Sequence, residues 1–267
     1  VLSLSACSGM SVSNKMYNEI LTIGPVTIHG YGLMIGIGLL LGLLFGYVRA
    51  KRRGIPIEHV LDIALYGFIA AFVGAKLLYI IVEVKDFIHN PMAIIASGGF
   101  VLYGGLILGL ITVYTYCRVK KVDFAYYMDL FIPTIPMGHA FGRFGCFMAG
   151  CCYGQQTDSW IGVIFPAGSL APVGIPLIPT QLISGIGNLI IASILIASYG
   201  KLKYRGNTGA LYLLLYGVCR FIIEFFRNDY RGAIGFLSTS QFISIFVITI
   251  SIGLFIYNKK SSTSTSL

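Results

Sequence analysis

Residues 28–48 read IHGYGLMIGIGLLLGLLFGYV, and the next five, residues 49–53, read RAKRR. A run of about 20 mostly apolar residues is long enough to cross the hydrocarbon core of a bilayer as a helix. A basic cluster directly after such a run is typical of the cytoplasmic end of a membrane span. This stretch therefore predicts a transmembrane helix whose C-terminal end lies in the cytoplasm.

Six further apolar runs follow along the chain. Of its 267 residues, 56% are hydrophobic and only 11% are charged, about half the charged fraction of a typical soluble domain. The composition predicts an all-α integral membrane protein of about seven transmembrane helices, without a sizeable soluble module. Besides 28–48, the predicted spans are residues 60–82, 94–117, 125–147, 180–199, 209–226 and 241–257.

The net charge of +9 comes mainly from four short basic clusters, which hold twelve of the 19 Lys and Arg residues. They follow the first, third, fifth and seventh predicted spans, so the N-terminus is expected outside and the C-terminus in the cytoplasm. No basic face with stacking aromatic residues accompanies them, so a nucleic-acid partner is not expected. The longest outside segment, 150–178, contains Trp160 and is predicted to be an interfacial loop. The clusters are Arg49/Lys51/Arg52/Arg53, Arg118/Lys120/Lys121, Lys201/Lys203/Arg205 and Lys259/Lys260.

The first residues carry a motif that needs its own interpretation. Leu4–Cys7 resembles the lipobox that precedes a lipid-modified cysteine, but no basic segment precedes it and its apolar run is short for a signal peptide. We interpret residues 1–15 as an upstream extension, with translation beginning at Met16. Residues 16–260 are then predicted to form one membrane-embedded domain, and residues 261–267 a cytoplasmic tail.

Several ionisable residues fall within the predicted spans or at their ends. Each costs about 2.5–3.5 kcal/mol at a helix centre, so pairing or function is expected. The spacing of Arg220, Glu224 and Arg227 places all three on one helix face. Two guanidinium groups around one carboxylate leave a positive charge that suits a phosphate. We favour function for Arg143 and Arg227, near the outer leaflet, and a structural role for Lys76 and Asp129.

A glycine-rich segment, residues 142–154, reads GRFGCFMAGCCYG and surrounds Arg143 with glycines that allow close approach of a ligand or backbone. It resembles the signature of the prolipoprotein diacylglyceryl transferase family, which reads roughly Gly-Arg-x-Gly-Asn-Phe-x-Asn-x-Glu-x-x-Gly. The resemblance continues in the same order over nearly all of residues 16–257. The other similar segments are Ile23–Val26, His29–Gly32, Gly98–Gly99, Tyr103–Leu106, Pro179–Leu182 and Arg220–Arg227.

This resemblance implies a multi-pass enzyme of the bacterial plasma membrane, monomeric and without a cofactor or metal. It would transfer a diacylglyceryl group from phosphatidylglycerol to the lipobox cysteine of a prolipoprotein, giving a thioether and glycerol phosphate. Arg143 and Arg227 would hold the departing phosphate, and Tyr31 would orient a substrate by hydrogen bonding. The substrate-binding residues implied with Arg143 are Gly142, Gly145, Gly154, Arg220, Glu224, Cys146, Gly104, Gly105 and Gln181.

The departures from the family pattern fall on its polar positions. The two signature Asn residues correspond to Cys146 and Ala149, and the signature Glu to Cys151. A His of the third region, proposed as a base, corresponds to Tyr103, whose reference pKa near 10 makes it a poor base. His139 is four residues before Arg143 on the same helix face, and we hypothesise that it supplies the missing base.

Three interpretations of the cysteines stay open. In the first, the family reaction proceeds with an altered residue set and the cysteines only pack, as small hydrophobic side chains. In the second, the chain is a paralogue with another lipid or acceptor, and Cys146, Cys151 or Cys152 is a nucleophile whose thiolate Arg143 favours. In the third, these cysteines, with His139 for a metal, form a redox or metal site, although Cys-x4-Cys-Cys is not a usual zinc spacing. A non-enzymatic lipid-binding protein is a further alternative.

Overall fold

The computed structural model describes residues 19–23, 26–166, 168–202, 204–228, 233–234 and 236–264. The predicted extension, residues 1–15, lies outside the described residues, together with its motif Leu4–Cys7. The predicted tail is described only as far as Ser264, where the last helix ends.

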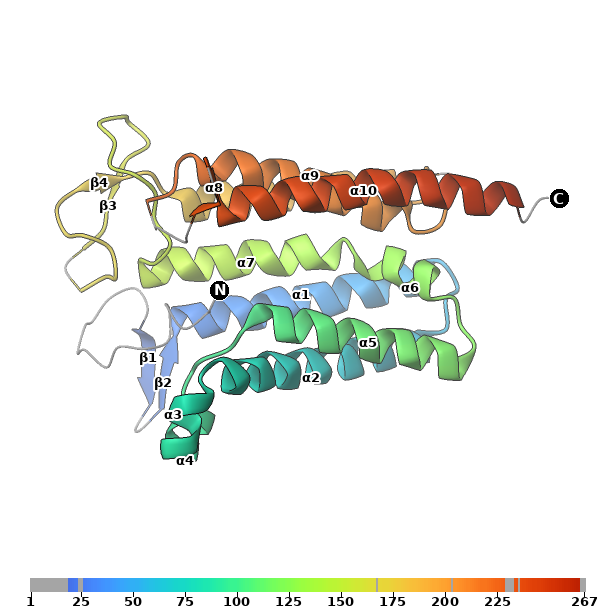
Figure 1. The fold of residues 1–267 in the computed structure, drawn as a ribbon, viewed down its shortest axis with the longest axis horizontal. Coiled ribbons are helices and arrows are strands. Elements are labelled where there is room, and N and C mark those ends of the chain that lie inside the picture. The colour runs from blue at the N-terminus through green and yellow to red at the C-terminus, as the bar shows by residue number, and fades with distance from the viewer. Residues whose placement is uncertain are drawn as a thin grey trace. The chain divides into compact units, whose positions relative to one another are not determined.

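Helices dominate the described chain, and three two-stranded antiparallel hairpins join or precede them (Figure 1). The hairpins pair β1 with β2, β3 with β4, and β5 with β6. The strands are β1 (Glu19–Ile23), β2 (Val26–His29), β3 (Val163–Ile164), β4 (Pro176–Leu177), β5 (Ala233–Ile234) and β6 (Leu237–Ser238). The helices are α1 (Gly30–Arg52), α2 (Ile57–Val82), α3 (Val84–His89), α4 (Pro91–Ala96), α5 (Leu102–Lys120), α6 (Phe124–Phe131), α7 (Thr134–Ala149), α8 (Thr180–Ser198), α9 (Asn207–Glu224) and α10 (Thr239–Ser264).

Five of the described helices are long and apolar enough to cross a membrane: α1, α2, α5, α8 and residues Thr239–Lys260 of α10. The prediction of a mostly helical protein with several membrane spans is therefore confirmed. Two further predicted spans correspond to α7 and α9, which have 16 and 18 residues. A typical span has about 20 residues, so both helices are short for one. They also carry charged residues, namely Arg143, Arg220 and Glu224.

The predicted continuous span 125–147 is wrong in one respect, because the chain forms two helices there. α6 ends at Phe131 and α7 begins at Thr134, with Pro133 between them. Proline has no N–H to continue the hydrogen-bond ladder, and its ring clashes with the preceding turn. The Thr134 hydroxyl donates to the Phe131 carbonyl at 2.7 Å and satisfies one group at the break.

The predicted span 94–117 also begins later than expected, because residues 97–101 are not helical and α5 starts at Leu102. The Lys76 ammonium donates to the carbonyl oxygens of Ser97 at 2.7 Å and Gly99 at 3.4 Å, which supports the structural role favoured for this lysine. The Tyr79 ring lies where a Cβ atom on Gly99 would stand, so only glycine fits. The non-helical segment 97–101 is thus held in place by Lys76 and Tyr79 of α2.

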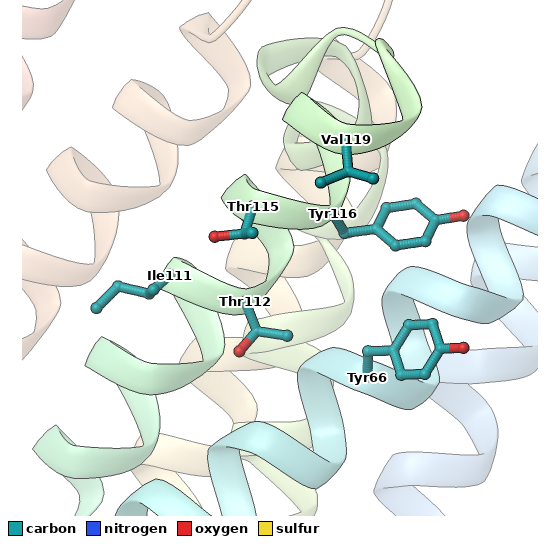
Figure 2. Close-up of a pocket in the computed structure, with 6 residues that line it drawn as sticks. All are labelled: Tyr66, Ile111, Thr112, Thr115, Tyr116 and Val119. Carbon is teal, nitrogen blue, oxygen red and sulfur yellow. The ribbon is translucent and has the colours of Figure 1, made fainter.

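The described chain divides into two compact units, and α1 contributes to both. One unit holds residues 47–124, in which α2 and α5 lie side by side (Figure 1). A hollow of about 370 Å³ lies on α2 and α5. Figure 2 labels the residues that line it, Tyr66 of α2 and Ile111, Thr112, Thr115, Tyr116 and Val119 of α5. Beside it, the Tyr116 hydroxyl donates to Asp62 Oδ2 at 2.7 Å and lies 2.9 Å from His59 Nδ1. This network joins the two helices.

The other unit holds residues up to 46 and from 125 onward. In it, α8 packs against α7 and α9, and α9 packs against α10. Ile132, between α6 and α7, forms a buried cluster with Ile191 and Leu195 of α8. The Asp129 carboxylate of α6 accepts the backbone N–H groups of Gly206 at 2.7 Å and Gly209 at 3.3 Å, so it caps the start of α9.

Candidate functional site

A pocket of about 190 Å³ lies within this second unit, where α7, α8 and α9 meet. Its polar lining comes from all three helices, two residues from each, and the rest of its wall is mostly apolar. An apolar pocket with a few convergent polar groups is the usual form of a ligand site. The polar residues are His139 and Arg143 of α7, Ser184 and Asn188 of α8, and Tyr216 and Arg220 of α9.

The α7 side of the pocket is a linked pair. The Nε atom of Arg143 donates a hydrogen bond to Nε2 of His139 at 3.1 Å, across one helical turn. Because Nε2 accepts this bond, a neutral His139 carries its proton on Nδ1. The His139 ring also lies 5.7 Å, centroid to centroid, from the ring of Tyr216. The sequence-based hypothesis placed His139 and Arg143 on one helix face, and the structure brings them into direct contact.

The α9 side is an ion-pair network around Glu224. Its Oε2 atom lies 2.9 Å from Nη2 of Arg220 and 4.0 Å from Nε of Arg227, so the predicted shared face of these three residues is observed. Ser240 accepts a second bond from Arg220 Nη2 at 2.8 Å, and Ser238 donates to Glu224 Oε1 at 3.1 Å. The network fixes Arg220 with excess positive charge beside the pocket.

Arg143 and Arg220 are therefore the two arginines that line one pocket. The sequence analysis paired Arg143 with Arg227 instead. Arg227 is buried, with 7% of its surface exposed, and it is not among the residues described as lining the pocket. Its backbone forms a bridge with Gly154, which places it where the α9–α10 connection meets the segment after α7.

The glycines of the signature segment serve different purposes. A Cβ atom on Gly145 would stand 3.0–3.2 Å from Tyr31, so this glycine lets α1 approach α7 closely. One on Gly154 would stand 2.6 Å from the Phe226 carbonyl oxygen, because three backbone segments meet there. One on Gly142 would meet nothing within 4 Å. Close packing thus explains Gly145 and Gly154, and it brings Tyr31 to the last turns of α7.

Two further predicted glycines lie in the first unit. Gly104 and Gly105 are buried in α5 against α2, where a Cβ atom on Gly105 would stand 2.7 Å from the Ala71 carbonyl oxygen. In the structure they allow close helix packing, whereas the resemblance predicts that they bind substrate. Tyr103, in the same turn, is 37% exposed.

The three clustered cysteines come together where α7 ends. The sulfur atoms of Cys146, Cys151 and Cys152 all lie within 4.8 Å of one another. Among the described residues, this group does not include His139, which the sequence analysis counted with the sulfur ligands. Gln181, predicted to bind substrate, donates its Nε2 to the Cys151 carbonyl at 2.7 Å and so holds the cluster's backbone.

Asn188 and Tyr216 are pocket residues that the sequence analysis missed. Asn188 donates Nδ2 to the Ser184 carbonyl at 2.8 Å, and its side chain also interacts with the imidazole of His139. A search for ionisable residues passes over a neutral amide, although an Asn inside an apolar run is itself a signal.

Comparison with known proteins places the chain in one family. A sequence model described as prolipoprotein diacylglyceryl transferase matches residues 18–257. The phosphatidylglycerol–prolipoprotein diacylglyceryl transferase of Clostridium tetani is 45% identical over 232 residues, 86% of this chain and 92% of that protein. The enzyme numbered 2 with this name in Clostridium perfringens is 41% identical, covering 87% of this chain and 91% of its own. The enzyme of this name in Finegoldia magna is 33% identical, covering 90% of this chain and 94% of its own. The chain belongs to the prolipoprotein diacylglyceryl transferase family.

Proposed function

We propose that this protein transfers the diacylglyceryl group of phosphatidylglycerol to the cysteine thiol of a prolipoprotein. The relatives carry this activity in their names. The observation that supports it here is the pocket with Arg143 and Arg220 on facing helices, because phosphate is the group of phosphatidylglycerol that two guanidinium forks fit.

The chemistry needs one bond to break and one to form. The sulfur of the lipobox cysteine attacks the glycerol carbon that carries the phosphate ester, and the C–O bond to phosphate breaks. The oxygen leaves with its electron pair as glycerol phosphate, and the diacylglyceryl group stays on sulfur as a thioether. Arg143 and Arg220 stabilise the departing phosphate, where negative charge increases as the bond breaks.

The thiol proton requires an acceptor near the phosphate. His139 is the proposed acceptor, and in the structure its Nε2 accepts a hydrogen bond from Arg143 at 3.1 Å. When Arg143 turns to the phosphate, Nε2 regains the lone pair that can take this proton. Binding of the donor and activation of the acceptor are then coupled through one arginine. Tyr31 remains proposed as a group that orients a substrate by hydrogen bonding, and Tyr103 and Cys151 remain predicted catalytic residues.

A cysteine of the cluster is not a good carrier of a covalently bound lipid in this reaction. A diacylglyceryl group on Cys146, Cys151 or Cys152 would be a thioether, and a second thiol does not displace a simple alkyl group from a thioether. Direct transfer to the acceptor thiol therefore fits the product better than a relay through an enzyme cysteine.

The membrane arrangement is part of the proposal. We infer seven crossings, formed by the five apolar helices together with α6–α7 and α9. The four basic clusters support an outside N-terminus and a cytoplasmic C-terminus. The protein acts as a monomeric, multi-pass protein of a bacterial plasma membrane, with residues 16–260 as one functional domain. The lipobox of the acceptor reaches the site from the outer leaflet.

A mass-spectrometric transfer assay tests the function. Purified protein is mixed with phosphatidylglycerol and a lipobox peptide, and a diacylglyceryl thioether on the peptide cysteine is the expected product. The Arg143→Ala variant, shown to be folded by a melting curve, is expected to give no thioether product. If the wild-type protein gives no product while a relative such as the Clostridium tetani enzyme is active in parallel, the proposed function is wrong.

A further inference from the structure

Three thiols from one short segment, residues 146–152, come together at the end of α7. Cys146 lies in the last turn of the helix, and Cys151 and Cys152 follow the turn that ends it. Their sulfur atoms lie within 4.8 Å of one another. Cys146 and Cys151 are 8% and 5% exposed, while Cys152 is more open to the surface.

The backbone of this turn is held in an unusual shape that brings the thiols together. Gly150 ends the helix with φ of +67°, and the Cys151 N–H donates to the Cys146 carbonyl at 3.1 Å. Cys152 has φ of +61°, a left-handed conformation that is uncommon for a residue with a Cβ atom. In extended backbone, neighbouring side chains point to opposite sides. The left-handed turn instead allows the side chains of the adjacent Cys151 and Cys152 to point to the same place.

The first turn of α8 fixes this shape from outside. The Thr180 hydroxyl donates to the Cys152 carbonyl at 2.9 Å, and Gln181 Nε2 donates to the Cys151 carbonyl at 2.7 Å. Both donors belong to largely buried residues, with 0% and 1% exposure. Strained backbone persists only where its surroundings determine it, and it gathers at functional sites. Here the left-handed backbone falls on Cys152 and the two supporting bonds fall on Cys151 and Cys152, which carry two of the three converging sulfurs.

We propose that Cys146, Cys151 and Cys152 form a binding site for a soft, thiophilic metal ion, with monovalent copper as the ion that fits best. Thiolate ligands select copper(I), zinc and iron–sulfur groups. The described group offers three ligand atoms, which complete a three-coordinate copper(I) site, whereas zinc would need a fourth ligand such as water. Three sulfurs about 2.3 Å from a central ion lie about 4.0 Å apart, so only a small closure is needed. The thiol protons pass to solvent on binding.

The role of such an ion would be to join the end of α7 to the segment that leads toward α8. Cys146 is three residues after Arg143, so the ion would stiffen the helix end that carries one of the pocket's two arginines. This inference stands apart from the transferase activity. Ion binding depends on the three sulfur atoms and on the hydrogen bonds from Thr180 and Gln181, and it can be measured without an assay of lipid transfer.

The experiment is an anaerobic titration of the reduced, detergent-solubilised protein with copper(I), buffered by a chromophoric copper(I) chelator. One ion per chain is expected, with a sulfur-to-copper absorption band in the ultraviolet. Cys146→Ser, Cys151→Ser and Cys152→Ser are each expected to weaken binding by more than about 100-fold, beyond the 10–100-fold typical of outer partners. Thr180→Val, which removes one supporting bond, is expected to fall within that smaller range.

The matched control is Cys117→Ala, which changes a buried cysteine of α5 outside the cluster. It is expected to bind copper(I) like the wild-type protein. Melting curves with and without copper(I) separate loss of binding from loss of folding, because an ion that binds only the folded state raises the melting temperature. Equal affinity in the wild type and the three serine variants would overturn the proposal. So would a folded, reduced protein that binds no copper(I) and instead loses two hydrogen atoms by mass on mild oxidation.

Discussion

Arg220 and Arg227 flank the same carboxylate, yet only Arg220 also lines the pocket. Their chemistry is identical, so position alone separates them. The pocket places Arg220 opposite Arg143, while the backbone bridge of Arg227 with Gly154 gives it a role in the connection between segments. Substitution can distinguish a phosphate contact from a structural tie.

Arg220→Gln is expected to lower kcat/KM for phosphatidylglycerol by about 10²–10³-fold, the typical cost of losing one preorganised donor to a developing negative charge. Arg227→Gln is expected to lower the melting temperature more and the specific activity of the folded fraction less. Steady-state kinetics and melting curves on both variants provide the measurement. The reverse ranking would restore Arg227 as the partner of Arg143.

Asn188 offers a second test at this scale, because its amide oxygen Oδ1 is buried and its side chain lines the pocket. Replacing it with Leu removes its hydrogen bond to the Ser184 carbonyl, so the free energy of unfolding should fall by about 1 kcal/mol. If a headgroup hydroxyl of the donor lipid uses this oxygen, KM should rise about 10-fold, equivalent to one hydrogen bond, with kcat little changed. An unchanged KM would show that the amide does not bind the donor.

The sequence points to the charged residues that line the pocket and passes over the neutral ones, and the roles of all of them stay predictions. Arg143, Arg220 and His139 stand out because ionisable groups are expensive inside a membrane. Asn188 and Tyr216 do not, since neutral polar side chains occur in many packed helices. The cysteines were recognised as a cluster, but the left-handed φ of Cys152, which the sequence does not specify, decides that they converge.

The elements of the fold carry their own tests, and the start of α9 is one. Asp129 of α6 accepts two backbone N–H groups there, at 2.7 and 3.3 Å. Asp129→Ala should cost about 1–2 kcal/mol of stability, as the loss of a helix cap does, and lower the melting temperature by a few degrees. Asp129→Asn keeps one oxygen acceptor and should cost less. Equal melting temperatures for all three proteins would contradict the capping role.

The contact between α2 and α5 gives a matched pair of glycine substitutions. A Cβ atom on Gly104 would stand 2.5 Å from Leu78 Cβ and would also clash with the Gly74 carbonyl. Gly104→Ala is therefore expected to destabilise the protein by about 1–3 kcal/mol or more. A Cβ atom on Gly36 of α1 would meet nothing within 4 Å, so Gly36→Ala should gain up to about 1 kcal/mol from helix propensity. Chemical or thermal unfolding in detergent measures both.

Helix existence was predictable at this scale, whereas helix interruptions were not. Apolar runs identify α1, α2, α5, α8 and α10 because spanning helices need a minimum length. The break at Pro133 has a local cause that hydropathy ignores. The late start of α5 depends on the contacts of Lys76 and Tyr79 with residues 97–99, and such contacts between distant segments are not readable from a periodic pattern.

The whole molecule is described by its path through the membrane, which the placement of basic residues predicts. Reporter domains fused after residues 53, 121, 205 and 260 should behave as cytoplasmic, and reporters inserted in 155–160 as external. Alkaline phosphatase and green fluorescent protein, active on opposite sides, provide the readout. A cytoplasmic signal from the 155–160 insertion would show that α6–α7 does not complete a crossing. Length and apolar composition alone identify five spans. For α7 and α9, which carry charged residues, this measurement decides whether they cross the membrane.

Trp160 is 94% exposed in the long loop after α7, and it is the only tryptophan in the chain. All indole emission from the native protein therefore reports on one loop, without engineered labels. In detergent that leaves the loop in water, the emission should be red-shifted and readily quenched by iodide. Insertion of the loop into the headgroup layer of a vesicle should shift it to the blue and shield it from the quencher. The protein thus carries its own optical probe of how deeply this loop sits in a bilayer.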